Sequence, residues 1–275
     1  MSNIGWVIYS REDAEKNKGF IRMLKEDFDQ YNVELKLVIL EEIDKPEVFV
    51  KNANIDFAIN RSRNSYIAEL LEKREIRVFN NSMVSDIANN KGKNYKYLEG
   101  IVPFLPIIYQ GEVIGSHESI QDFTYPYVIK SCCGHGGSQV FLVHNEDEKK
   151  QALSKIKDEY VIQKLCSNIG KDVRVYVIGN KIVKAVLRTS KESFKSNYSL
   201  GGSAREYNLD NYEIAMVKQI LNKFQIDYGG IDFTFHNGKA VFNEIEDAVG
   251  ARMLYSVCDI DIAKLFVDYI IGEIS

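Results

Sequence analysis

Three carboxylates near the C-terminal end of the chain have the spacing of a candidate metal site. Asp232 lies in one alternating run of apolar and polar residues, and Glu244 and Glu246 lie in the next run. The runs are joined by residues 236–239 (HNGK), whose Asn-Gly pair is a strong β-hairpin signal. Because side chains alternate along a strand, Glu244 and Glu246 share one face of this hairpin.

The register of the hairpin decides whether Asp232 joins the two glutamates. A two-residue loop places Asp232 opposite Asn243 and on the wrong face, whereas a three-residue loop places it opposite Glu244. The three-residue loop also puts one set of apolar residues on the opposite face, namely Ile231, Phe233, Phe235, Val241 and Ile245. We therefore predict the three-residue loop, with all three carboxylates on one polar face.

Three acidic side chains on one face repel one another unless a cation joins them. Oxygen ligands suit a hard cation such as Mg²⁺, which usually keeps part of its coordination shell for water and substrate phosphates. A solvated polar strand face is an equally good interpretation of these carboxylates taken alone. The rest of the chain must decide between the two.

The composition is that of an ordinary globular protein. The chain has 275 residues, of which 27% are charged and 45% hydrophobic, and its net charge is −4. This acidic balance argues against a general nucleic-acid or membrane-surface binder, and no apolar run reaches the ~20 residues of a membrane span. The four cysteines match neither a zinc site nor a disulfide framework. We expect a cytoplasmic protein whose cysteines are reduced and which has no signal peptide.

The first third of the chain predicts a small parallel sheet, because short apolar runs alternate with helical periodicity. The predicted strands are Ile4–Tyr9, Val33–Leu40, Ile55–Asn60 and Arg77–Asn80, and the predicted helices are Asn17–Tyr31 and Asn64–Arg74. No G-x-G-x-x-G sequence follows the first strand, so a dinucleotide site is not expected. We interpret this part as a scaffold or substrate-side domain.

A lysine followed by a glycine-rich loop marks the middle of the chain. Lys130 lies in a predicted strand, Pro126–Ser131, and the loop at residues 134–138 (GHGGS) joins this strand to the next. Glycines let backbone N–H groups close over phosphate oxygens, so the loop is a candidate lid, and a flexible hairpin tip is the alternative. A predicted hairpin over residues 172–188 adds Arg174 and Arg188. Cations beside an acidic metal site are what nucleoside-triphosphate chemistry requires.

These motifs follow one another in an order typical of one superfamily. Over residues 80–271 the chain resembles the ATP-grasp superfamily, and within it the glutamate-ligase-like branch that includes enzymes modifying a ribosomal protein. The resemblance rests on an ordered series of short motifs: Val128–Lys130, Gly134–Gly137, Val161–Gln163, Gly170–Arg174, Phe194–Asn197, Gly201–Ala204, Gly229–Asp232 and Asn243–Glu246. Each motif is weak alone, whereas all of them in this order are a specific signal.

The resemblance implies roles in nucleotide binding. Lys93 and Lys130 are similar to the two lysines that contact ATP phosphates, and Asp172 is similar to a carboxylate of the nucleotide pocket. The other implied nucleotide-binding positions are Gly134, Gly136 and Gly137 in the lid, Gln163, Lys164, Leu165 and Cys166 at adenine, and Lys195 and Asn197 near the transferred phosphate.

The metal ligands and their surroundings follow the family with departures. Asp232, Glu244 and Glu246 match ligands that normally hold two Mg²⁺ ions, for which Mn²⁺ substitutes, but the family's third ligand is usually asparagine. Lys195 replaces the family's usual arginine. The family commonly continues with a small residue, proline and glycine, whereas residues 247–252 read DAVGAR. This segment is expected to face the acceptor substrate, so substrate identity does not carry over.

The implied fold is of the α/β (α+β) class. A Rossmann-like parallel sheet domain is expected at residues 1–85, followed by a two-lobed ATP-grasp domain with antiparallel sheets at residues 86–275. Lobe A is expected at about residues 86–160, with the glycine lid at 134–138, and lobe B at about residues 161–275. Further helices are predicted at Glu146–Lys157, Asn211–Phe224 and Asp261–Ile271.

The implied activity is that of an ATP-dependent carboxylate–amine ligase, in which Lys130 and Arg188 are the catalytic residues. The carboxylate and amine would be small molecules or peptides, and Arg174 or Arg252 would bind a substrate carboxylate. Members of the family are usually dimers or tetramers, which makes a homo-oligomer the expectation. A small-molecule kinase of the same architecture and a non-catalytic ATP-binding protein are the alternatives, and the presence of all three metal carboxylates ranks the latter last.

Overall fold

The N-terminal part is a four-stranded parallel sheet in the computed structural model, which describes residues 3–137, 139–190 and 202–275. The strand order is β2-β1-β3-β4, and every neighbouring pair is parallel, as predicted. The strands are β1 (Asn3–Tyr9), β2 (Val33–Ile39), β3 (Phe57–Asn60) and β4 (Arg77–Phe79). The helices between them are α1 (Arg11–Lys16), α2 (Lys18–Asp29), α3 (Pro46–Lys51) and α4 (Ser65–Glu72), with a 3-10 turn, η1, at Leu40–Glu42.

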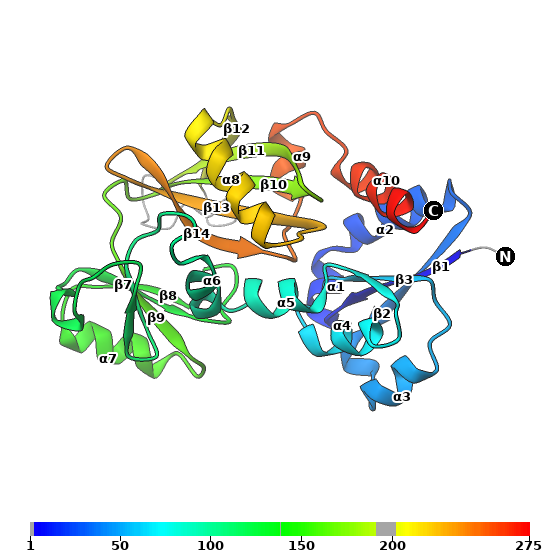
Figure 1. Ribbon diagram of the computed structural model, residues 1–275, viewed down its shortest axis with the longest axis horizontal. Coiled ribbons are helices and arrows are strands. Elements are labelled where there is room, and N and C mark those ends of the chain that lie inside the picture. The colour runs from blue at the N-terminus through cyan, green and yellow to red at the C-terminus, as the bar shows by residue number, and fades with distance from the viewer. Residues whose placement is uncertain (1–2, 138, 191–201) are drawn as a thin grey trace.

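The two faces of this sheet are covered by different parts of the chain. One face, with Trp6 and Ile8, packs on α3 and α4. The other, with Val7 and Phe57, packs on α2 and on the C-terminal helix α10 (Ile262–Ile274). Figure 1 shows α10 lying beside α2, next to the first sheet. The end of the chain therefore completes the core of its beginning.

Lobe A contains the second sheet, which is antiparallel with the strand order β6-β5-β9-β7-β8. Its strands are β5 (Ile107–Tyr109), β6 (Glu112–Ile114), β7 (Tyr127–Ser131), β8 (Val140–Val143) and β9 (Tyr160–Lys164). The accompanying helices are α5 (Ser82–Ala88), α6 (Lys91–Leu98) and α7 (Glu146–Ser154), with a second 3-10 turn, η2, at Ile120–Asp122. The glycine loop joins β7 to β8.

Lobe B contains the third sheet, which is antiparallel with the strand order β12-β11-β10-β13-β14. Its strands are β10 (Lys171–Ile178), β11 (Lys181–Thr189), β12 (Ser203–Tyr207), β13 (Tyr228–His236) and β14 (Lys239–Glu246). Helices α8 (Asn211–Lys223) and α9 (Arg252–Val257) accompany it. The α/β class with one parallel and two antiparallel sheets is confirmed, whereas the boundaries at residues 85 and 160 stay predictions.

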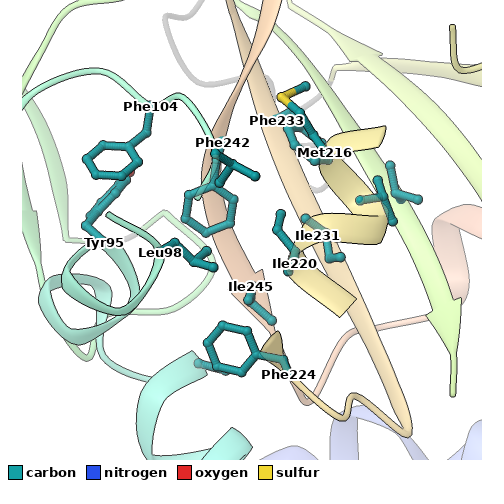
Figure 2. Close-up of a cluster of buried hydrophobic side chains, with 14 of the residues drawn as sticks. Tyr95, Leu98, Phe104, Met216, Ile220, Phe224, Ile231, Phe233, Phe242 and Ile245 are labelled. Carbon is teal, nitrogen blue, oxygen red and sulfur yellow. The ribbon is translucent and has the colours of Figure 1, made fainter. Parts of the chain in front are cut away.

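The apolar face of the β13–β14 hairpin forms the centre of the largest core. Figure 2 shows Phe233, Phe242 and Ile245 of the hairpin among side chains that include Tyr95 of α6 and Ile220 of α8. All of these are buried, and the Tyr95 and Phe242 rings meet edge to face, with centroids 5.8 Å apart. Because this face is fixed by packing, the opposite face of the hairpin is held in a defined position.

The turn of this hairpin differs from the predicted one. The loop is the two-residue Asn237-Gly238, since the ladder pairs Phe235 with Ala240, and the predicted three-residue loop is wrong. The ladder then shifts by one residue, and Asp232 lies opposite Glu244 after all. The pairing that matters for the site is therefore confirmed, although its cause is a β-bulge.

The bulge residue is Asn243. It has no opposite residue on β13, because Phe242 pairs with Phe233 and Glu244 with Asp232. Val241, which the three-residue loop would have placed in the core, is only half-buried on the polar face. The buried residues of β14 are instead Ala240, Phe242 and Ile245.

None of the helices in the described residues is long and apolar enough to cross a membrane. Six helices of the described residues begin at an Asn or Asp whose side chain accepts a backbone N–H, which satisfies part of the unpaired first turn. These N-cap residues are Asn64, Asn81, Asn90, Asn145, Asp210 and Asp261.

Candidate active site

One cavity of about 990 Å³ is lined by residues from all three parts of the chain. Lys130 of β7 comes from lobe A, whereas Arg174 of β10 and Arg188 of β11 come from lobe B. Asp13 and Arg63, which follow β1 and β3, come from the first sheet. Cations and carboxylates that are far apart in sequence thus reach a common space.

Asp232, Glu244 and Glu246 form a compact acidic cluster on the polar face of the β13–β14 hairpin. One oxygen from each carboxylate lies within 4.8 Å of the others. Burial raises the pKa of Glu246, an effect that Arg174 opposes and that Asp232 and Glu244 reinforce. The cluster therefore offers three carboxylates as oxygen ligands, the type of ligand that a hard divalent cation prefers.

Two arginines hold Asp232 in its ionised form. Arg174 donates from Nε and Nη2 to the two Asp232 oxygens at 2.7 and 2.6 Å, and Arg188 Nη2 donates to Oδ2 at 2.7 Å. Burial alone raises the pKa of Asp232, but Arg174 and Arg188 outweigh burial and lower it to about 2. Arg174 also lies 2.9 Å from Glu246, and Arg188 makes two hydrogen bonds to Asp172. The arginines thus link Asp172 to the acidic cluster.

Two lysines bring further positive charge to the same cavity. Lys130 Nζ donates to Asn243 Oδ1 at 2.8 Å, and burial lowers the pKa of Lys130 to about 8. Lys91 Nζ donates to the carbonyl oxygen of Gly134 at 2.6 Å and lies 3.3 Å from Glu244. Lys91 therefore connects the glycine loop to the acidic cluster.

Lys93, the predicted phosphate contact, points away from this cavity. Its Nζ donates to both oxygens of Asp86, at 2.7 and 2.8 Å, and it is not among the cavity-lining residues. Side chains two residues apart on a helix point about 200° apart, so Lys91 and Lys93 of α6 cannot face the same space. The structure brings Lys91, and not Lys93, to the site.

The other predicted nucleotide-binding positions line the cavity where they are described. These are Gly134, Gly136, Gly137, Gln163, Lys164, Leu165, Cys166 and Asp172. Among them, the Gln163 side chain donates to the buried hydroxyl of Tyr95 at 2.7 Å, so this side chain is already engaged by the protein. Arg252, a predicted substrate residue, is exposed and lines the cavity as well. Lys195 and Asn197 lie outside the described residues.

Lys91 and Asn243 were assigned no role from the sequence, although the sequence contains a signal for each. Asn90 is a good N-cap, and a helix beginning there turns Lys91 and Lys93 to different sides. The core positions Phe242 and Ile245 are three residues apart instead of two, which is the spacing that a bulge at Asn243 produces. A bulge of this kind aims an extra side chain at a neighbouring site.

Comparison with known proteins identifies the family. A family model described as a RimK-like ATP-grasp domain matches residues 107–270. The chain belongs to the RimK-like ATP-grasp family. The resemblance predicted from the ordered motifs is confirmed.

Similarity to known proteins extends over nearly the whole chain. The chain is 30% identical to an uncharacterized protein of Mycoplasma pneumoniae over 95% of this chain and 90% of that protein. It is 25% identical to a probable alpha-L-glutamate ligase of Haemophilus ducreyi, over 75% of this chain and 70% of that protein. The structure of D-alanine–D-alanine ligase from Bacillus anthracis complexed with ATP aligns with a TM-score of 0.74 and 18% identity, covering 100% and 97% of the two chains.

The acidic cluster of this ATP-grasp chain fits the Mg²⁺ ions that the family implies. The donor set consists of carboxylate oxygens alone, which hard cations prefer. Asp232 accepts three hydrogen bonds from the two arginines, and a carboxylate has about four lone-pair sites. Glu244 and Glu246 are each contacted by one cation, Lys91 and Arg174 respectively. Oxygen sites therefore remain on all three residues.

Proposed function

We propose that the protein is an ATP-dependent carboxylate–amine ligase that forms an amide or peptide bond. A carboxylate oxygen of one substrate attacks the γ-phosphorus of ATP, the bond to the ADP oxygen breaks, and an acyl phosphate results. The amine nitrogen of the second substrate then attacks the acyl carbon, phosphate leaves, and the nitrogen loses a proton. The products are the amide, ADP and phosphate.

The observation that carries this proposal is the convergence of cations and carboxylates on one cavity. Lys91, Lys130, Arg174 and Arg188 reach it from α6, β7, β10 and β11, and Glu244 and Glu246 reach it from β14. Asp232 of β13 belongs to their cluster but is buried and does not itself line the cavity. Transfer of a phosphoryl group needs positioned positive charge more than covalent catalysis. Membership of a family with a probable glutamate ligase supports bond formation as the outcome of that transfer.

In the proposed mechanism, Lys91 and Lys130 bind phosphate oxygens. Asp232, Glu244 and Glu246 would hold two Mg²⁺ ions, for which Mn²⁺ would substitute, and these ions would neutralise phosphate charge. Asp172 and the segment 163–166 form the nucleotide pocket. Lys195 and Asn197, which resemble residues near the transferred phosphate, remain part of the proposal.

Arg188 is the proposed stabiliser of the acyl phosphate and of the oxyanion that forms when the amine attacks. Its Nε and Nη2 are held by Asp172 and Asp232, which orients the planar guanidinium, while Nη1 donates to no described residue. A preorganised donor of this kind stabilises developing negative charge without having to reorient. The glycine loop is proposed to close over the site and exclude water, which would hydrolyse the acyl phosphate.

The proposal is tested by incubating the protein with ATP and Mg²⁺ and a panel of carboxylates and amines that includes L-glutamate. ADP, phosphate and product mass are measured together. A ligase yields one ADP and one phosphate per amide, whereas a stable phosphorylated product without free phosphate would indicate a kinase. Glu244→Ala is expected to reduce turnover by about 100-fold or more, because it removes a proposed metal ligand. Turnover at the parent rate in this variant would exclude the metal-site assignment.

A further inference from the structure

The segment that follows the acidic cluster, residues 247–252, forms part of the cavity wall. Asp247, Ala248, Gly250 and Arg252 line the cavity, and the segment connects the last cluster carboxylate to helix α9. It belongs to lobe B by sequence. Its backbone, however, is held largely by residues of the N-terminal sheet.

Arg61, the first residue after β3, makes the most extensive of these contacts. Its Nη1 donates to the carbonyl oxygen of Asp247 at 3.3 Å, and its Nη2 donates to the carbonyl oxygen of Val249 at 2.5 Å. Asn80, which follows β4, donates to the Asp247 carbonyl oxygen at 3.3 Å as well. Residues at two strand ends of the first sheet therefore hold the carbonyl groups of Asp247 and Val249.

The guanidinium of Arg61 is buried and depends on these carbonyls for its hydrogen bonds. The residue is 3% exposed, and no carboxylate of the described residues lies within ion-pair distance of it. Its guanidinium carbon lies 4.9 Å from the ring centroid of Tyr228, and its Nε donates to the hydroxyl of Tyr9 at 3.3 Å. A buried cation needs its hydrogen-bond partners, and the backbone of the segment supplies two of the three.

The segment has little freedom to move against this contact. Val249 is fully buried, and a Cβ placed on Gly230 would come within 2.8 Å of the Val249 side chain. On the lobe B side, the hydroxyl of Tyr176 donates to the carbonyl oxygen of Gly250 at 3.2 Å. The carbonyls at positions 247, 249 and 250 are thus all fixed, and the side that lines the cavity is left for ligands.

We propose that Arg61 is a positioning residue for the acceptor side of the active site, acting through the backbone of residues 247–252. The N-terminal sheet thereby sets the shape of the wall against which the attacking amine is placed, while the nucleotide is held by the two lobes. The assignment of this wall to the acceptor substrate rests on the proposed ligase function. The mechanical part, that Arg61 fixes the segment, does not depend on that function.

Hydrogen–deuterium exchange tests the mechanical part with the full chain. Arg61→Lys keeps the charge but loses the planar fork, so the amides of residues 247–254 are expected to exchange about tenfold faster than in the parent. Arg74→Lys is the matched control, because Arg74 also donates to two backbone carbonyls, those of Val50 and Ala53, but is not among the residues that line the cavity. Equal exchange of this peptide in the parent, Arg61→Lys and Arg74→Lys would overturn the proposal.

Steady-state kinetics tests the functional part once a carboxylate substrate is in hand. With L-glutamate as the amine probe, Arg61→Lys is expected to raise the KM for the amine about tenfold and to leave the KM for ATP within about twofold. Arg61→Met should have the larger effect of the two, since it removes the charge as well. A parallel rise in both KM values would show a general loss of structure and would contradict a positioning role. If the parent forms no amide at all, the ligase proposal fails while the exchange result still decides whether Arg61 fixes the segment.

Discussion

At the scale of single residues, the site is a balanced set of charges. Asp172, Asp232, Glu244 and Glu246 interact with Arg174, Arg188 and Lys91, and Lys130 adds a further cation through Asn243. A buried arrangement of this kind is stable only while each charge is paired. A polyphosphate that enters with metal ions can exchange partners with this set without leaving a charge unpaired.

Lys91 and Lys93 provide a residue-scale prediction with an internal control. Lys91→Ala removes a cation at the cavity and is expected to raise the dissociation constant for ADP with Mg²⁺ by about fivefold or more. Lys93→Ala removes only an exposed pair with Asp86 and should leave it within about twofold. Isothermal titration calorimetry measures both variants. A larger loss for Lys93→Ala than for Lys91→Ala would restore the assignment made from the sequence.

At the scale of elements, the sequence predicted those parts that depend on a local pattern. The four strands of the first sheet and helices α2 and α4 follow from hydrophobic periodicity, and each begins or ends within a few residues of its predicted limits. The short α1 and the three-residue strands β5 and β6 were not predicted, since segments of this length carry too few residues for a period to show.

For the site, too, the sequence predicted the parts that depend on a local pattern. The structure brings Lys130, Arg188 and the three carboxylates into one region, as the ordered motifs predicted, because each lies on a strand with a clear pattern. The roles of these residues stay predictions. The predicted turn of the β13–β14 hairpin was wrong. The Asn-Gly pair favours a two-residue loop, and such a loop places Asp232 opposite Glu244 only if the strand contains a bulge. Long-range packing decides such a conflict, and packing cannot be derived from local sequence.

The bulge gives the element-scale prediction. Deleting Asn243 leaves Phe242 opposite Phe233 and Glu244 opposite Asp232, so the ladder becomes regular and the core face is preserved. The thermal midpoint is expected to change by less than about 5 °C. Lys130 loses its amide partner, however, and affinity for ADP with Mg²⁺ should fall about tenfold. Calorimetry measures both quantities, and Asn243→Ala, which keeps the bulge, separates loss of the amide from loss of the bulge. An unfolded deletion variant would show that the bulge is needed for the hairpin itself.

At the scale of the whole molecule, the three sheets depend on one another. Helix α10 packs on α2, and one core is shared by the first sheet, lobe B and the C-terminal helices. Asp227 lies where these parts meet, just before β13, and accepts hydrogen bonds from Arg77 of β4 and from the hydroxyl of Tyr269 of α10. Its Oδ2 is buried without a described hydrogen-bond partner. The junction therefore encloses a carboxylate that is only partly compensated.

The stability of this junction should depend on pH through Asp227. Burial raises its pKa from 3.8 to about 6, although Arg77 and Tyr269 oppose the rise and Glu273 adds to it. Between about pH 4 and pH 6 the folded state keeps a proton that the unfolded state has lost, so this contribution to stability falls as pH rises and is constant above that range. Asp227→Asn cannot titrate, and the free energy of unfolding of the parent relative to this variant is expected to fall by about 2 kcal/mol from pH 4 to pH 7. Thermal and urea unfolding across this range measure the difference, with Asp147→Asn on the solvated side of α7 as the control for the change in charge. A difference that stays constant, or that grows with pH, would mean that Arg77 and Tyr269 compensate the buried carboxylate fully.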